Sequence, residues 1–162
     1  MIIRLEKPAD RDAIYTLHSG AFPTDDEARL VDRLRQDGDL VLSLVAVKDQ
    51  QIVGHIAFSN MQAPFPALGL APVSVSEAHR RQGIAAALIS RGLEMAKDQG
   101  CSGVFVLGDP DYYRRFGFST EMAKGFQSPY AGPYLMAMPL ADDELPSASG
   151  RVEYAAAFAS LG

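Results

Sequence analysis

The sequence predicts an α/β protein of the α+β type, with helices flanking a mixed, mostly antiparallel central sheet. Short apolar runs rich in β-branched residues stand between turn residues and are typical of strands. The stretches 10–20, 24–38 and 85–97 place apolar residues at three- and four-residue spacing, as amphipathic helices do. In addition, strand 70–75, helix 85–97 and strand 103–107 have the order of a crossover unit. Such a unit joins two parallel strands by a right-handed connection.

The first two helices have recognisable start and stop signals. Asp10 precedes an apolar-periodic run, and its short polar side chain is expected to cap a helix that runs to about Gly20. Thr24 and Glu27 have the spacing of a capping box for a second helix. Gly38 is expected to end that helix.

The other elements follow from apolar runs and from glycine and proline. Residues 40–47 and 51–60 predict a hairpin, and Pro110 suits the first turn of a short helix through Phe116. Further strands are expected at residues 1–7, 118–122 and 134–140, and a loop at 61–68. Residues 141–149 are expected to form an exposed linker, and residues 150–162 a last strand or an extended cover.

Size and composition indicate one domain over residues 1–162 and narrow the class of partner. With 48% hydrophobic residues the chain can bury a full core, and a net charge of −5 argues against general nucleic-acid binding. No apolar run approaches the ~20 residues of a membrane span, and no signal peptide is recognised, so a cytoplasmic location is expected. Cys101 has no partner thiol and is expected to be buried. His18, His55 and His79 are scattered in the sequence, so no metal site is predicted.

The turn before the helix at 85–97 has the features of an anion site. A helix start leaves backbone N–H groups without partners, and the positive end of the helix dipole lies there. Gly83 allows close approach to that backbone, and Arg80 and Arg81 add positive charge. A pyrophosphate suits such a site. The glycine patterns of a P-loop and of a dinucleotide-binding turn are both absent from this stretch.

Two motifs in this region resemble those of a known family. Arg80-x-x-Gly83-x-Ala85 after an apolar strand is similar to the acyl-CoA signature of the GCN5-related N-acetyltransferase (GNAT) superfamily. Residues 108–118, GDPDYYRRFGF, resemble its later Tyr-x-x-x-Gly-Phe element, with Tyr113 at the tyrosine position. The amino-acid pattern of residues 108–118, together with that of the tail at residues 150–158, is similar to the YhbS-type branch of the superfamily. The resemblance covers nearly the whole chain.

This resemblance implies an enzyme and a cofactor. The expected activity is direct transfer of the acetyl group of acetyl-CoA to a primary amine of an unidentified small molecule or protein. In the family fold the two parallel strands splay apart and the pantetheine arm lies in the gap, and a homodimer is compatible with the family. The residues that the resemblance assigns to acetyl-CoA binding are Val73, Val75, Arg80, Arg81, Gln82, Gly83, Ile84, Ala85, Asp109 and Tyr113.

The catalytic assignments differ in how far the residues support them. Tyr113 is the expected general acid, because a phenol keeps its proton at neutral pH and can donate it to a leaving thiolate. A backbone N–H near Val75 is expected to stabilise the oxyanion. The general base stays open: Glu77, which is on the face of Val73 and Val75 if the strand continues, is one candidate, and Asp109, His55 or a water chain are others.

Two other functions compete with catalysis. A non-catalytic acyl-CoA-binding sensor would bind the cofactor and would keep its role when Tyr113 is replaced by phenylalanine. An interaction domain with an unused phosphate turn would not bind CoA at all. The acceptor pocket is expected to be shaped by residues 22–38 and 60–68, because loops on a rigid scaffold carry specificity.

Overall fold

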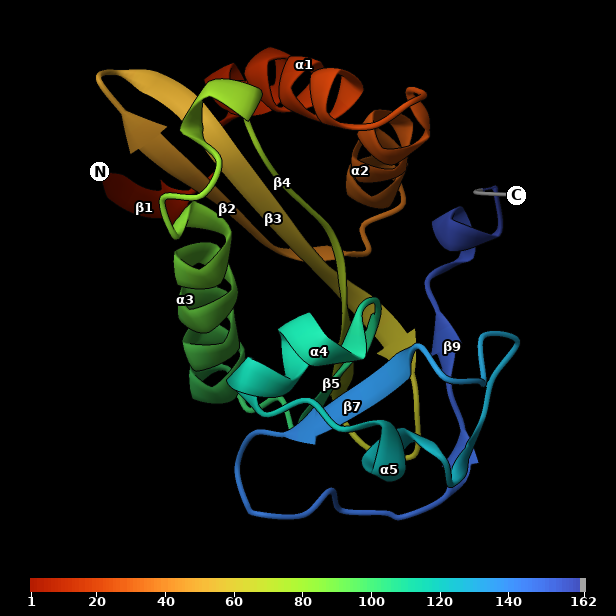
Figure 1. The fold of residues 1–162 in the computed structure, drawn as a ribbon. Coiled ribbons are helices and arrows are strands. Elements are labelled where there is room, and N and C mark those ends of the chain that lie inside the picture. The colour runs from red at the N-terminus through yellow and green to blue at the C-terminus, as the bar shows by residue number, and fades with distance from the viewer. Residues whose placement is uncertain (161–162) are drawn as a thin grey trace.

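A computed structural model describes residues 1–160 of the chain. The chain folds around one central sheet (Figure 1). The strands lie in the order β1-β2-β3-β4-β5-β7, and only β4 and β5 are parallel neighbours. A short strand, β9, pairs with the end of β3, and β6 and β8 form a separate parallel pair. The strands are β1 (Ile2–Leu5), β2 (Leu40–Lys48), β3 (Gln51–Gln62), β4 (Ala67–Val75), β5 (Gly103–Leu107), β6 (Phe126–Gln127), β7 (Leu135–Pro139), β8 (Gly150–Arg151) and β9 (Glu153–Tyr154).

Helices cover both faces of the sheet, as expected. Along β2, Leu42 and Leu44 pack in the same cluster as buried residues of α3, whereas Val45 packs with residues of α1 and α2 on the opposite face. The α-helices are α1 (Arg11–Ala21), α2 (Asp26–Gln36), α3 (Ile84–Asp98), α4 (Pro110–Tyr113) and α5 (Thr120–Ala123). Short 3-10 helices cover Pro8–Asp10, Glu77–His79, Arg114–Phe116 and Ala156–Ser160. In residues 1–160 no helix combines the length and apolarity needed to cross a bilayer.

The parallel pair is short, and this opens the sheet. β4 pairs with β5 from Ala67 to Leu70, and β5 ends at Leu107. β4 continues to Val75 and there pairs only with β3, after a register shift between Ile56 and Phe58 of β3. One edge of the second half of β4 therefore faces a gap. This gap lies where the expected splay of the two parallel strands would place it.

Several local predictions are wrong. Residues 118–122 are not a strand: Ser119 caps α5 by accepting a hydrogen bond from the Met122 N–H at 3.3 Å, and only Ser119 itself bridges β7. The loop predicted at 61–68 is confined to residues 63–66, because β3 extends to Gln62 and β4 begins at Ala67. Asp10 is the N-cap residue of α1, but its side chain makes no capping hydrogen bond to this helix; its carboxylate instead binds Arg4 and the Lys7 N–H.

Thr24 accepts a hydrogen bond from the Asp26 N–H, but no reciprocal bond from Glu27 completes the expected capping box. Residues 141–149 contain no helix or strand and are mostly exposed. The C-terminal cover contains β8, β9 and a 3-10 helix through Ser160, and residues 161–162 of that prediction lie outside the described residues.

The contact of α3 with the sheet depends on Gly92. A Cβ atom built at this position would lie 2.2 Å from a ring carbon of Phe58, which is fully buried. We expect Gly92→Ala to destabilise the protein by about 1–3 kcal/mol, because a buried ring must shift against its neighbours to make room for the methyl group. The measurement is urea unfolding followed by circular dichroism.

Gly20 in α1 is the matched control for Gly92→Ala. It is also a helical glycine, but a Cβ there would meet nothing within 4 Å. Gly20→Ala should therefore stabilise the protein by roughly 0.5–1 kcal/mol through helix propensity. Equal effects of the two substitutions would contradict the proposed Gly92–Phe58 packing.

Candidate active site

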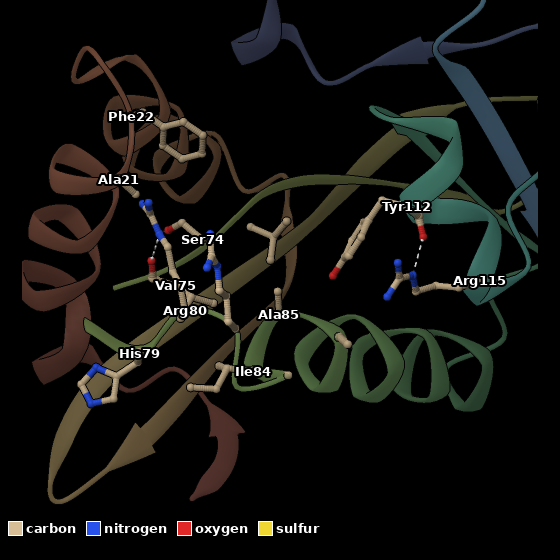
Figure 2. Close-up of a pocket in the computed structure, with 14 residues that line it drawn as sticks. Ala21, Phe22, Ser74, Val75, His79, Arg80, Ile84, Ala85, Tyr112 and Arg115 are labelled. Carbon is tan, nitrogen blue, oxygen red and sulfur yellow. Dashed lines mark hydrogen bonds between the residues drawn. The ribbon is translucent and has the colours of Figure 1, made fainter. Parts of the chain in front are cut away.

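A cavity of about 520 Å³ lies where α1, β4, the start of α3 and α4 come together. Its walls bring residues from distant parts of the sequence to one place (Figure 2). The lining residues are Ala21, Phe22, Val73, Ser74, Val75, His79, Arg80, Arg81, Gly83, Ile84, Ala85, Ala86, Tyr112 and Arg115. Seven of them are among the ten residues that the sequence assigned to cofactor binding: Val73, Val75, Arg80, Arg81, Gly83, Ile84 and Ala85.

The start of α3 forms one wall of this cavity. Gly83 is the N-cap residue with φ of 80°, a left-handed conformation that disfavours any residue with a Cβ, and Arg81 has φ of 65°. The first helical hydrogen bond runs from the Ala87 N–H to the Gly83 carbonyl, and no side chain caps the helix. The N–H groups of residues 84–86 are therefore without helical partners and are available to an anion.

The open edge of β4 forms a second wall. The Ser76 N–H donates to the Val53 carbonyl at 2.8 Å, so Ser76 and Ser74 occupy hydrogen-bonded positions opposite β3. Hydrogen-bonded and non-hydrogen-bonded positions alternate in an antiparallel ladder. The N–H and C=O groups of Val73 and Val75 consequently point away from β3, toward the gap. Arg80 reaches this edge, where its Nε donates to the Val75 carbonyl at 3.4 Å.

The segment after β5 supplies two side chains on the opposite side of the cavity. Asp109 caps α4 by accepting a hydrogen bond from the Asp111 N–H at 3.0 Å. Tyr112 and Arg115 line the cavity, and the Tyr112 hydroxyl points into it (Figure 2). The Arg115 guanidinium lies 4.6 Å from the centre of the Tyr112 ring, a cation–π contact that holds both side chains in place.

The side chain of Tyr113 packs in a different environment from that of Tyr112. Its ring packs edge-on against Phe118 with centroids 5.8 Å apart, and it lies against Gly108. Burial, together with Tyr112, raises the pKa of the Tyr113 phenol to about 12. Tyr113 in turn contributes, after burial and Tyr130, to the raised pKa of Tyr154, whose hydroxyl is buried and has no hydrogen-bond partner. Tyr113 is not among the residues that line the cavity.

Besides Tyr113, three residues assigned from the sequence do not line the cavity. β4 ends at Val75 and does not continue to Glu77, which begins a 3-10 helix, is exposed, and lines a separate cavity beside α1. The premise that placed Glu77 on the face of Val73 and Val75 is therefore wrong. Asp109 is an exposed helix cap. Gln82 is exposed and its side-chain oxygen accepts a hydrogen bond from Lys48.

The histidines are less scattered than their sequence positions indicated. His18 of α1 and His55 of β3 are both fully buried and lie 2.8 Å apart, between His18 Nε2 and His55 Nδ1. In residues 1–160 no third metal-ligating side chain joins them as a group. His18 also contacts Ser74, a cavity residue, at 2.8 Å. No local pattern indicates Ser74, because nothing in the sequence connects it to the turn at residues 80–85, whereas Phe22 belongs to the segment 22–38 that is expected to shape the acceptor pocket.

Comparisons with known proteins agree with this geometry. A family model described as the Acetyltransferase (GNAT) family matches residues 11–118. The chain is 39% identical over 160 residues to "Uncharacterized N-acetyltransferase YhbS" of Escherichia coli K12, covering 95% of this chain and 96% of that protein. The structure of Escherichia coli YhbS in complex with CoA is similar with a TM-score of 0.93 and 38% identity, covering 99% and 93% of the two chains.

A second solved structure is similar to nearly the same extent. It is a GNAT family acetyltransferase from Brucella melitensis in complex with acetyl-CoA. Its TM-score is 0.82 at 37% identity, and the match covers 97% of each chain. The motifs, the fold and these matches together show that the chain belongs to the acetyltransferase (GNAT) family.

Proposed function

We propose that this protein transfers the acetyl group of acetyl-CoA directly to a primary amine. The observation that carries the proposal is the meeting of two backbone features in one cavity: the uncapped start of α3 and the open edge of β4. One suits a diphosphate and the other suits the amide groups of a pantetheine arm. The CoA and acetyl-CoA complexes of the two similar structures support the same cofactor.

The residues present fit acetyl-CoA, which supplies an acyl group activated as a thioester. The N–H groups of residues 84–86 would hold the diphosphate, with charge from Arg80 and Arg81 at the same wall. The backbone groups of Val73 and Val75 that face the gap would pair with the pantetheine amides. The Val75 N–H is the proposed donor to the carbonyl oxygen of the acyl group.

Tyr113 is the proposed general acid because of its position in the Tyr-x-x-x-Gly-Phe motif, although Tyr112 and not Tyr113 lines the cavity. Its pKa of about 12 means that the phenol remains protonated throughout the working pH range, so it can donate a proton to a leaving sulfur atom. Glu77 lies outside the cavity, and its assignment as the base has no geometric support. The acceptor amine, a homodimer and a cytoplasmic location remain predictions from the sequence.

Thermal unfolding with and without acetyl-CoA tests cofactor binding. At 100 times its dissociation constant, a ligand that binds only the folded state stabilises by about 2.7 kcal/mol. For a chain of this size the unfolding midpoint should then rise by roughly 5–10 °C. Arg81→Ala should reduce the shift, because Arg81 lies at the diphosphate wall, whereas Arg91→Ala on the exposed side of α3 should not.

The same samples distinguish catalysis from binding alone. Thiol release should follow when a primary amine is added to the protein with acetyl-CoA. A midpoint shift without thiol release from any amine would favour the sensor alternative. No shift at millimolar acetyl-CoA would contradict both the enzyme and the sensor.

A further inference from the structure

A chain of hydrogen bonds crosses the molecule from the cavity to the opposite end of the sheet. Ser74 Oγ lies 2.8 Å from His18 Nδ1, and His18 Nε2 lies 2.8 Å from His55 Nδ1. His55 Nε2 lies 2.8 Å from Ser43 Oγ. Ser43 Oγ in turn lies 2.7 Å from the carboxylate oxygen Oε1 of Glu6. These five side chains, called the polar relay below, come from β4, α1, β3, β2 and the residue after β1.

The two ends of the polar relay are in contact with different surroundings. Ser74 lines the cavity described above, although little of its surface is exposed (Figure 2). Glu6 at the other end pairs with Arg35 at 2.8 Å and lies 3.8 Å from Arg11. The Glu6 side chain is 11% exposed, so water reaches this end. The interior members, His18 and His55, are fully buried.

The carboxylate sets one direction for every hydrogen bond in the polar relay. Ionised Glu6 can only accept, so Ser43 must donate its hydroxyl proton to Glu6. Ser43 Oγ therefore accepts from His55 Nε2–H. His55 Nδ1 is then bare and accepts from His18 Nε2–H, and by the same rule His18 Nδ1 accepts from the Ser74 hydroxyl. As a result the Ser74 hydroxyl donates its proton to His18, and Ser74 Oγ can only accept a hydrogen bond from a group in the cavity.

Burial keeps both imidazoles neutral. It lowers the pKa of His18 to about 4. For His55, burial is the largest cause, and electrostatic interactions with His18 and with the Arg35 guanidinium of α2 act in the same direction, so the pKa of His55 lies well below the usual range. The other charged groups near this region are Glu6, Arg11 and Asp32, the last bound to Arg35. A protonated, positively charged imidazole is therefore disfavoured at either position. A proton can pass along the polar relay only if each imidazole accepts a proton on one nitrogen while it releases a proton from the other.

We propose that the polar relay carries the proton of the acceptor ammonium from the cavity to Glu6 and so takes the place of a general base. This inference rests on the proposed function. In the shift, the N–H bond of the ammonium breaks as its proton binds Ser74 Oγ, and the Ser74 proton moves to His18 Nδ1. The His18 Nε2 proton moves to His55 Nδ1, the His55 Nε2 proton to Ser43 Oγ, and the Ser43 proton to Glu6.

The shift is balanced in protons and charge. The ammonium becomes a neutral amine, Glu6 becomes a neutral carboxylic acid, and the four groups between them keep their number of protons with reversed tautomers. Glu6 then exchanges with water. The reverse shift begins with a proton that Glu6 takes from water, and it ends when Ser74 Oγ gives its proton to the base that acetyl transfer leaves, which is the CoA thiolate or the Tyr113 phenolate; it restores the starting direction. No buried group carries a new charge at the end of either shift.

The direction of the polar relay can be tested without any acceptor. Nitrogen NMR of the full-length protein labelled with ¹⁵N-histidine reports which ring nitrogen holds the proton. We expect the Nε2–H tautomer for both His18 and His55 at pH 7. An Nδ1–H tautomer at either histidine would reverse the direction, leave Ser74 unable to accept, and overturn the proposal.

Kinetics test the proton transfer itself. The probes are spermidine, 2-phenylethylamine and Nα-acetyl-lysine amide, and the one that the wild-type protein acetylates fastest is used for all variants. Ser43→Ala breaks the polar relay at a position separated from Ser74 by His18 and His55, and it is expected to lower kcat at pH 7 by about 10²-fold, with KM for acetyl-CoA unchanged. Ser59→Ala is the matched control, because Ser59 is also a buried serine of the sheet but has no hydrogen-bond partner.

The pH dependence separates proton transfer from structural damage. An alkyl ammonium has a pKa of about 10.4, so the free amine becomes available as the pH approaches 10. The deficit of Ser43→Ala should shrink over this range, and Ser43→Ala combined with Ser74→Ala should cost no more than either change alone. A deficit that is equal at all pH values, or wild-type kcat in Ser43→Ala, would overturn the relay while leaving the acetyltransferase intact. Failure of the wild-type protein to acetylate any of the three amines would instead count against the proposed function, and the relay would fall with it.

Discussion

Replacing Tyr113 with phenylalanine is expected to lower kcat for acetyl transfer by about 10²–10⁴-fold, which is the usual contribution of a positioned general acid. The substitution removes one hydroxyl and keeps the ring that packs on Phe118 and Gly108. The fold and the acetyl-CoA-dependent rise in unfolding midpoint should therefore stay as in the wild type. Steady-state thiol release with a saturating amine measures the loss.

Tyr112→Phe is the control for this experiment, because it removes the same group one residue earlier. Tyr112 lines the cavity and points into it, so its loss is expected to raise KM for acetyl-CoA while changing kcat little. A large fall in kcat with Tyr112→Phe and none with Tyr113→Phe would move the general acid to Tyr112. Because the pKa of Tyr113 is about 12, no alkaline fall in wild-type kcat is expected from this group below about pH 11.

Acidification is expected to destabilise the protein strongly between pH 6.5 and 4. His18 has a pKa of about 4 when folded and about 6.5 when unfolded, so the unfolded chain takes up a proton that the folded chain refuses. The free energy of unfolding therefore falls as the pH falls through this range, and His18 alone accounts for about 3 kcal/mol. His55 adds to the fall in the same direction, because its folded pKa is also lowered.

Urea unfolding from pH 7 to pH 4.5 measures this slope. His18→Gln and His55→Gln should each flatten it, whatever their effect on stability at pH 7. His79→Gln is the control and should leave the slope as it is, because His79 is only half-buried, on the turn before α3, and contacts Ser76 rather than the buried pair. A slope that survives loss of both buried histidines would show that other groups govern the acid transition.

Much of the fold could be predicted because its signals are local. Strands such as β5 are short apolar runs, and Gly83 and Gly100 stand next to the two ends of α3, as a helix start and stop require. The prediction of a strand at 118–122 fails where one side chain decides the structure. Phe118 suits either state, and the bond from the Met122 N–H to Ser119 Oγ turns the chain into a helix.

The candidate site could be predicted only where it is contiguous in sequence. The turn at residues 80–85 contains both the helix start and the positive charges, so its role is visible in one motif. Ser74 and His18 are 56 residues apart, and only the packing of α1 on the sheet brings them together. Glu77 was misplaced for a related reason: the sequence does not show that β4 ends two residues before it.

The polar side chains buried between α1 and the sheet also fix how the strands align. His55 of β3 stands opposite Val45 of β2 and Ser74 of β4. Its hydrogen-bond partners are Ser43 of β2 and His18 of α1, and His18 also contacts Ser74. A slip of β2 by one residue would turn Ser43 to the α3 face of the sheet. A slip by two residues would keep Ser43 on its present face but would move it about 7 Å along the strand. Either error leaves a buried imidazole without its partner, at a cost of about 1–3 kcal/mol. Apolar side chains tolerate a shift of strand register more readily than hydrogen-bonded ones, so these few hydrogen bonds favour a single register of β2 and β3.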